Sequence, residues 1–338
     1  MPGDPTWLTS GSEAQAQAMA KATSALDGLT LSSPPAAPAA PASPAAPAPV
    51  VISPGAPHDA TLLLLPGFTC SAESMAESWM PAISETLGDR GGRLKLVFLN
   101  APEREVSCYG DERPRLQAWH DYFTDHGGDE GRPELEEEID EAHVAWSRAR
   151  IHAAIDAEVA LLGGDHSRVA VGGASQGCCM ALDAALTHPA VLGGVFASFG
   201  QVYACTLRAL GTAPGGAASK RRLRLVAFHG AGDRCIAASL AMRSYAQLID
   251  LGFSALRLHL APYLGHCESN EAESALLCDA LVSWGLVPRE GEGEASPTPT
   301  PPGAELGVEL GAEGQLVMPA MPGTPLHCHQ GGSVPPGS

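Results

Sequence analysis

The chain has 338 residues, of which 45% are hydrophobic and 17% charged, and its formal net charge at pH 7 is −18. Residues 1–57 hold 11 of the 29 prolines and residues 288–338 hold 10, so only 8 lie in the 230 residues between. This distribution excludes one globule along the whole length and predicts a single domain over residues 58–287. So acidic a chain is a poor electrostatic match for nucleic acid.

The cysteines and apolar runs indicate the compartment. Nine cysteines are scattered without a zinc-type spacing or a signal-peptide pattern, which predicts reduced thiols and a cytoplasmic location. No apolar run reaches the roughly 18 residues of a membrane-spanning helix, so no transmembrane segment is expected. The tail motif His327-Cys328-His329 offers soft ligands without a tetrahedral spacing, so no metal is expected there.

The first 57 residues form a predicted low-complexity Ala/Pro-rich extension. Residues 12–29 are compatible with a short amphipathic helix that has Ser12 as its cap. Proline at every second or third position then predicts a stiff, extended linker over residues 32–57, the type of segment that SH3-type domains bind. At the other end, the Gly/Pro/Glu-rich residues 288–338 predict a disordered tail.

The segment between the tails alternates short apolar runs with helical patterns. The predicted strands are Ala60–Leu65, Leu94–Leu99, Arg168–Gly172, Leu192–Ser198, Leu223–His229 and Leu256–Leu260. Helices are predicted near residues 72–88, 137–163, 176–188, 237–251 and 268–285. This alternation predicts an α/β fold with a mostly parallel, doubly wound sheet covered by helices. In such sheets the chemistry lies at the carboxyl ends of the strands.

An acidic run covers residues 134–141. Clustered carboxylates are found in metal sites and at surfaces that bind basic partners. They also complement the helix dipole and stay solvated when they begin a helix. The run is therefore predicted to begin the long helix near 137–163, with no metal bound.

The predicted strand Arg168–Gly172 leads into Gly173-Ala174-Ser175-Gln176-Gly177 and then into a helix. A G-x-S-x-G pattern between a strand and a helix marks a nucleophile elbow, whereas elsewhere it is an ordinary glycine-rich turn. The turn is so tight that Ser175 must adopt a strained backbone, and Gly173 and Gly177 remove Cβ atoms that would clash. Ser175 is therefore the predicted nucleophile.

A serine hydroxyl needs a base that is itself oriented by an acid. In α/β-hydrolases the partners follow in the order Ser, acid, His. Asp233 follows the strand predicted at 223–229, and His266 follows the strand predicted at 256–260. Both would share the carboxyl edge of the sheet with Ser175. His229, at a strand end, is predicted as a structural hydrogen-bonding residue rather than the base.

Acyl transfer also requires donors for the developing oxyanion. The backbone N–H of Gln176, directly after the nucleophile, is one predicted donor. The loop after the strand Ala60–Leu65 supplies the second, and there the N–H of Phe68 is the candidate. Such a site requires no metal and no organic cofactor.

Residues 60–286 resemble the acyl-protein thioesterases and their lysophospholipase and carboxylesterase relatives. The resemblance rests on L-L-P-G-F-T, V-F-L-N-A-P at 97–102, A-W-H-D-Y-F at 118–123, the Ser175 elbow, H-G-A-G-D at 229–233 and G-H-C at 265–267. It implies an α/β-hydrolase fold and hydrolysis of an acyl thioester or ester, such as a palmitoyl-cysteine on a protein or a lysophospholipid. It also implies pocket or supporting roles for Trp119, Asp121 and His229.

The chain departs from the family pattern in three places. Pro66 stands where the family usually has a histidine before glycine, so any hydrogen bond from that side chain is lost. His120 replaces the usual phenylalanine, and Cys178 and Cys179 replace a glycine and a small residue after the elbow. For the two cysteines, close packing on the sheet is favoured over a redox role.

Two alternatives to thioester hydrolysis remain open. A lysophospholipase or a general short- or medium-chain carboxylesterase would use the same triad, because acyl length depends on a pocket that the sequence does not define. A non-catalytic scaffold would use the fold and its proline-rich linker for interactions. The order of the predicted triad argues against the scaffold.

Overall fold

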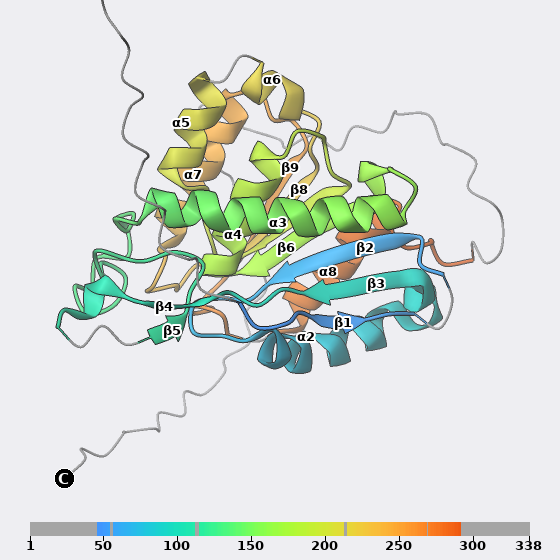
Figure 1. The fold of residues 1–338 in the computed structure, drawn as a ribbon, viewed down its shortest axis with the longest axis horizontal. Coiled ribbons are helices and arrows are strands. Elements are labelled where there is room, and N and C mark those ends of the chain that lie inside the picture. The colour runs from blue at the N-terminus through green and yellow to red at the C-terminus, as the bar shows by residue number, and fades with distance from the viewer. Residues whose placement is uncertain (1–45, 55–56, 112–114, 213–214, 269, 292–338) are drawn as a thin grey trace, which may run out of the picture. The chain divides into compact units, whose positions relative to one another are not determined.

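A computed structural model describes residues 46–54, 57–111, 115–212, 215–268 and 270–291 of the chain (Figure 1). The helix predicted at 12–29 and the motif His327-Cys328-His329 lie outside the described residues. So do nearly all of the predicted tail and most of the predicted linker. The described residues include all those predicted to carry the chemistry.

Seven strands form one sheet in the spatial order β1-β3-β2-β6-β7-β8-β9. They are β1 (Val50–Ile52), β2 (Ala60–Leu65), β3 (Leu94–Phe98), β6 (Val169–Ala174), β7 (Gly194–Ser198), β8 (Leu225–Gly230) and β9 (Leu256–Ala261). All neighbours pair in parallel except β1, which is antiparallel to β3. The predicted mostly parallel sheet is confirmed, and every strand predicted from an apolar run is present.

The edge strand β1 differs from the prediction. It lies within residues 32–57, where the prolines predict an extended linker, yet Val50 pairs with Phe98 and Ile52 with Leu96. Val50-Val51-Ile52 is an apolar run without proline, so it retains the donors that a sheet needs. The linker prediction is wrong for these three residues, and the sheet begins before residue 58.

Helices cover both faces of the sheet. They are α2 (Ala72–Leu87), α3 (Glu141–Leu161), α4 (Gln176–Thr187), α5 (Ala204–Thr212), α6 (Gly216–Lys220), α7 (Ala238–Asp250) and α8 (Glu271–Ser283). Ser71, Asp140 and Asn270 cap α2, α3 and α8 with side-chain oxygens that accept backbone N–H groups. Among the described helices, none is both long and apolar enough to cross a membrane.

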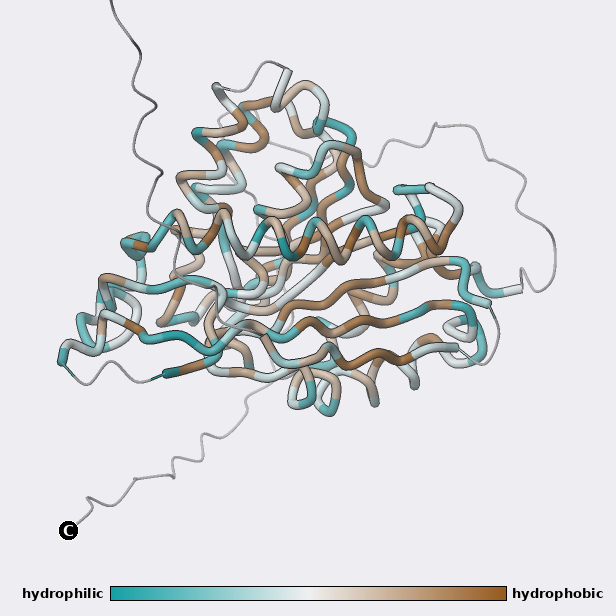
Figure 2. The backbone as a smooth tube through the Cα atoms, viewed as in Figure 1, coloured by the Kyte–Doolittle hydropathy of each residue, from teal (hydrophilic) through white to brown (hydrophobic). Residues whose placement is uncertain are grey.

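The two faces of the sheet carry separate hydrophobic cores. On one face, α3, α4, α5 and α7 enclose a core that takes Leu63 and Leu65 from β2. On the other face, α2 and α8 enclose a core that takes Leu62 and Leu64. Because successive side chains of a strand point to opposite faces, β2 is buried along its whole length. Figure 2 shows the central strands as predominantly hydrophobic segments.

The chain reverses its direction across the sheet between β2 and β6. From β2 it proceeds to β3 on one side, whereas β6 is followed by β7, β8 and β9 on the other. The carboxyl ends of β2 and β6 therefore flank a switch point, where the crossover connections leave room for a ligand.

The segment between β3 and α3 contains structure that the sequence patterns did not predict. Strands β4 (Glu103–Glu105) and β5 (Arg115–Gln117) form a small antiparallel pair. Only Glu141 of the acidic run lies within α3, so the prediction that the run begins this helix is wrong for most of it. Glu136 accepts a backbone N–H at the start of α5, and burial raises its pKa. Glu137 accepts three donors of a neighbouring loop.

Candidate active site

Ser175 occupies a sharp turn between β6 and α4. Its backbone dihedrals are φ 53° and ψ −124°, which a residue with a Cβ rarely adopts. Its N–H donates to the carbonyl oxygen of Ser198, 2.9 Å away, and its carbonyl oxygen accepts from the N–H of Cys179 at 3.1 Å. The neighbouring sheet strand and the first turn of α4 thus hold the strained conformation that the elbow pattern predicted.

The two elbow glycines permit a close approach of backbones. A Cβ added at Gly177 would lie 2.1 Å from the carbonyl oxygen of Leu65 and 2.3 Å from that of Pro66. One added at Gly173 would lie 2.7 Å from the Leu65 oxygen. The start of α4 therefore packs directly against the end of β2, and this brings the loop after β2 beside Ser175.

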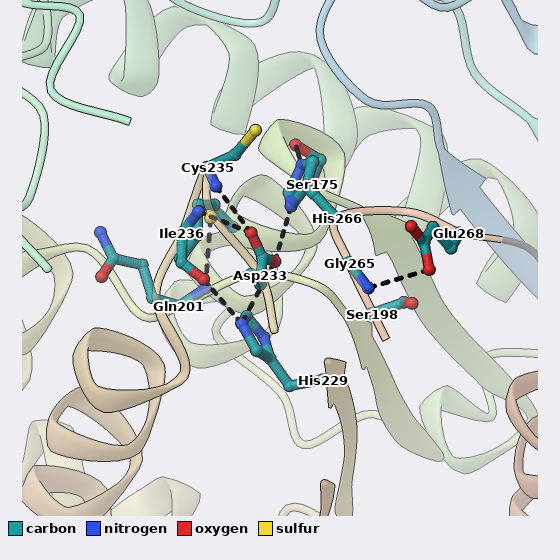
Figure 3. A network of polar contacts seen from close by, with 12 residues as sticks. Ser175, Ser198, Gln201, His229, Asp233, Cys235, Ile236, Gly265, His266 and Glu268 are labelled. Carbon is teal, nitrogen blue, oxygen red and sulfur yellow. Dashed lines mark hydrogen bonds and ion pairs between the residues drawn. The ribbon is translucent and has the colours of Figure 1, made fainter. Parts of the chain in front are cut away.

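The structure brings together the three residues predicted as a triad (Figure 3). Nε2 of His266 lies 2.8 Å from Oγ of Ser175, and Nδ1 of His266 lies 2.7 Å from Oδ2 of Asp233. The carboxylate can only accept, so Nδ1 carries a proton and donates it, while Nε2 accepts from the serine hydroxyl. This is the arrangement in which an imidazole can take a proton from a serine.

Asp233 is held in place by backbone donors. Its Oδ1 accepts the N–H groups of Cys235 at 2.8 Å and Ile236 at 2.9 Å, which leaves Oδ2 for His266. His229 lies behind the carboxylate, where its Nε2 donates to the carbonyl oxygen of Ile236 at 2.8 Å. Burial lowers the pKa of His229, so it is a neutral support. The structure thus places it away from Ser175, as predicted.

The loop after β2 lies against the nucleophile. A Cβ added at Gly67 would lie 3.3 Å from the Cβ of Ser175, so this loop passes within van der Waals contact of the elbow. The indole N–H of Trp119 donates to the carbonyl oxygen of Pro66 at 2.8 Å, and this hydrogen bond holds the loop in place. The backbone N–H of Gln176, as the first of α4, has no acceptor within the helix.

A cavity of about 420 Å³ opens beside Ser175 and His266. Its apolar and aromatic lining comes mainly from the loops after β2, β4–β5 and β8, and consists of Phe68, Tyr109, Tyr122, Leu135, Ile139, Tyr203, Ile236 and Leu240. Four carboxylates, Asp125, Asp129, Glu136 and Glu137, also line it. The cavity therefore combines a surface for an apolar group with acidic side chains.

Comparison with known sequences identifies the family. The profile of the phospholipase/carboxylesterase family matches residues 46–275. The chain belongs to this family. A relative, acyl-protein thioesterase 1 of Schizosaccharomyces pombe, is 31% identical over 154 residues, which cover 45% of this chain and 60% of the relative. The match therefore spans less than two thirds of that protein's length.

Solved structures with the same fold are more distant in sequence. Arabidopsis thaliana SOBER1 superposes with a TM-score of 0.56 at 22% identity, over 67% of this chain and 98% of that one. Zea mays acyl-protein thioesterase 2 has a TM-score of 0.55 at 23% identity, over 70% of this chain and 98% of that one. These likenesses confirm the predicted α/β-hydrolase fold.

In this member of the family, the residues after β5 support the site through contacts with its loops. Besides its contact with Pro66, Trp119 donates its backbone N–H to the side-chain oxygen of Gln176 at 2.8 Å. Asp121 accepts the N–H and hydroxyl of Ser107 at 2.7 and 2.6 Å and so holds the loop that borders the cavity. Neither residue reaches Ser175, so both act through others.

His120, which stands where the family usually has phenylalanine, is a neutral aromatic side chain in this structure. Burial lowers its pKa to about 3. Its Nδ1 lies 3.2 Å from the carbonyl oxygen of Asp121 and donates to it, so Nε2 accepts from the hydroxyl of Tyr203 at 2.7 Å. Its ring also packs edge-on against Tyr122, with centroids 4.7 Å apart. Tyr203 and Tyr122 line the cavity, and the sequence patterns did not single out either of them.

The two cysteines that follow the elbow, Cys178 and Cys179, are buried in the core, which confirms the packing role. A Cβ added at Gly200 would lie 2.5 Å from Sγ of Cys178 and 3.1 Å from Sγ of Cys179, so both thiols are closely packed. Burial raises the pKa of Cys179 to about 12 and that of Cys178 as well. Both are therefore protonated thiols with little nucleophilic character.

A buried acid lies behind the elbow and was missed by the sequence patterns. Glu273 on α8 accepts the hydroxyl of Ser198, whose carbonyl oxygen in turn accepts the N–H of Ser175. Burial raises the pKa of Glu273 to about 7, although the Ser198 hydroxyl lowers it. The helical pattern of α8 gave no signal for this contact, because it depends on how the helix meets the end of β7.

Replacing Glu273 by glutamine is expected to flatten the pH dependence of stability. Its folded pKa lies above its unfolded value, so the folded state holds the proton more tightly, and the unfolding free energy falls as pH rises through this window. The fall between about pH 4.5 and about pH 7 is expected to shrink by roughly 1–3 kcal/mol in Glu273→Gln, measured by urea unfolding. Glu271→Gln, at an exposed position on the same helix, is the control, and equal profiles for wild type and Glu273→Gln would contradict the assignment.

Proposed function

We propose that the protein hydrolyses acyl esters and thioesters through a covalent intermediate on Ser175. The observation that carries this proposal is the continuous hydrogen-bonded chain from Ser175 through His266 to Asp233 at the wall of a cavity. Membership in the phospholipase/carboxylesterase family supports it. Similarity to the S. pombe acyl-protein thioesterase 1 supports the thioester branch.

In the proposed first step, His266 takes the hydroxyl proton as Ser175 attacks the acyl carbonyl. Asp233 keeps the imidazole oriented and stabilises its positive charge. The backbone N–H groups of Phe68 and Gln176 are the proposed donors to the oxyanion, one from the loop after β2 and one from the start of α4. His266 then returns the proton to the leaving alcohol or thiol, and a water attacks the acyl-serine by the same route in reverse.

The cavity lining favours an acyl group with an apolar chain and disfavours a phosphate. The side chains of Phe68, Ile236 and Leu240 offer an apolar wall beside the nucleophile. The carboxylates that line the cavity would repel an anionic headgroup. We therefore place an S-acylated protein or a small ester ahead of a lysophospholipid, although all three would use the same triad.

A panel of acyl substrates on the full chain tests this assignment. Esters and thioesters from butyryl to palmitoyl are expected to turn over with kcat/KM at least about tenfold above that of a lysophospholipid. The reason is that repulsion between the phosphate and the carboxylates of the cavity weakens binding by about 1.4 kcal/mol or more. Each substrate is measured by steady-state kinetics with a thiol or fatty-acid readout. A lysophospholipid that is turned over best would select the alternative assignment.

A non-catalytic scaffold predicts a different result. It would show no turnover and no labelling of Ser175 by a fluorophosphonate probe, and its function would rest on the proline-rich segment and an SH3-type partner. Most of that segment lies outside the described residues, so the partner stays a prediction. A cytoplasmic location is also proposed, and the free thiols of all eight described cysteines support it.

A further inference from the structure

An exposed cysteine lies beside the Asp233–His266 pair, and the proposed mechanism leaves its thiol unused. Sγ of Cys235, a ring nitrogen of His266 and a carboxylate oxygen of Asp233 all lie within 4.8 Å of one another. Cys235 lines the cavity, and Figure 3 shows it next to the triad. Asp233 and Cys235 are neighbours in one loop, and the fold adds His266 from the loop after β9.

The backbone of Cys235 is fixed on two sides. Its N–H donates to Oδ1 of Asp233 at 2.8 Å, and a Cβ added at Gly127 would lie 2.0 Å from its carbonyl oxygen. The residue therefore sits between the Asp233 carboxylate and the loop that contains Gly127. Its side chain is held toward the cavity without a backbone rearrangement, which is the preorganisation that a ligand site requires.

The three donor groups are those that zinc prefers. Zn²⁺ binds thiolate sulfur, imidazole nitrogen and carboxylate oxygen at roughly 2.0–2.3 Å and often takes three protein ligands with water in the fourth position. The separations between donor atoms in such a site are about 3–4 Å, so small side-chain movements bring the present atoms into range. Cys235 adds the soft ligand that a Ser-His-Asp triad lacks.

We propose that Zn²⁺ binds Asp233, Cys235 and His266 and reversibly inhibits the enzyme. The proposal rests on the proposed hydrolase function. On binding, the Cys235 thiol loses its proton to solvent and its sulfur bonds to the metal, while the proton on Nδ1 of His266 moves to Nε2 and Nδ1, the nitrogen beside Asp233, gives its lone pair to the metal. Nothing is oxidised or reduced. The imidazole can then no longer take the proton of Ser175, so hydrolysis stops until the metal is removed.

The test is a zinc titration of ester hydrolysis by the full chain in a metal-buffered solution. Wild type is expected to be inhibited by micromolar free Zn²⁺ and restored by a chelator. Cys235→Ser, compared with its own activity without metal, is expected to need at least about tenfold more Zn²⁺. Cys108→Ser, which alters another cavity-lining thiol, is expected to respond like wild type.

A second group of possible ligands provides a further control. Asp156, His166 and His188 also have ligand atoms within 4.8 Å of one another, at the amino end of β6. His166→Ala removes one of these and is expected to leave the inhibition unchanged. If His166→Ala abolishes the inhibition, or if Cys235→Ser is inhibited as strongly as wild type, the proposed site is wrong.

A spectroscopic readout separates this proposal from the hydrolase assignment. Co²⁺ bound to Cys235 is expected to give a thiolate-to-metal charge-transfer band that Cys235→Ser lacks. The band tests the site even if no substrate is hydrolysed. Turnover without metal, together with no inhibition and no Cys235-dependent band, would overturn the zinc site and leave the hydrolase function intact.

Discussion

Replacing Ser175 by alanine is expected to lower kcat on a p-nitrophenyl ester by at least about 10⁴-fold. The reason is that the variant keeps the cavity, His266 and Asp233 but has no oxygen to form the acyl intermediate. Because the side chain is small and partly exposed, the unfolding free energy is expected to change little. Steady-state kinetics and fluorophosphonate labelling, run on the same preparations, measure the effect.

The matched control is Ser219→Ala, a serine in an exposed position on α6. It is expected to retain wild-type turnover and labelling, which makes the loss specific to the elbow. A decrease of less than about tenfold in Ser175→Ala would show that another group carries the reaction. Labelling that persists in this variant would lead to the same conclusion.

Replacing Gly177 by alanine is expected to disrupt both the fold around the elbow and the activity. The new methyl group would overlap the carbonyl oxygens of Leu65 and Pro66, at 2.1 and 2.3 Å. These are backbone atoms, so α4 must move away from β2, and the oxyanion loop moves with it. We expect a loss of about 3 kcal/mol or more in unfolding free energy and at least about a hundredfold in kcat/KM.

Gly211→Ala serves as the comparison for this variant. Gly211 lies in α5, and a Cβ added there meets nothing within 4 Å. It is expected to be neutral or to stabilise the helix by a few tenths to about 1 kcal/mol. Urea unfolding and ester hydrolysis of both variants give the answer. A Gly177→Ala protein with wild-type stability and activity would show that α4 can shift without cost.

Much of this fold is predictable because its signals are local. The strands that carry the site are short apolar runs covered on both faces, and the elbow pattern has meaning from the strand and helix beside it. Ser175, Asp233 and His266 can be located because each lies in the turn or loop that follows a strand, at the same edge of the sheet. No signal from a distant residue is needed for these predictions.

The remainder depends on contacts between distant segments. Strand β1 is recognised only from its pairing with β3, because the prolines on both sides of it predict an extended linker. The residues before α3 are acidic like a helix start, but Glu136 and Glu137 accept backbone donors from other loops instead. Tyr203 lies in the loop between β7 and α5, so a search of the loops after the strands, rather than of the strand ends alone, is needed to find it.

The departure at Pro66 has a simple structural explanation. Proline has no N–H to donate, but its carbonyl oxygen accepts the indole N–H of Trp119 and lies close to Gly177. The loop is therefore held through its backbone carbonyl group, which a residue of any type would supply at this position. Trp119 also contacts Gln176, so one residue positions the segments that carry both proposed oxyanion donors.

A chain must include β1 to form the complete seven-stranded sheet. Asn100 donates to the carbonyl oxygen of Ala48 at 2.7 Å and accepts the N–H of Ala72 at the start of α2. A chain cut at residue 58 would lose this bridge and would leave the outer edge of β3 open to strands of other molecules. The proline-rich extension therefore ends in residues that close the sheet, so removing it completely would expose a site for aggregation.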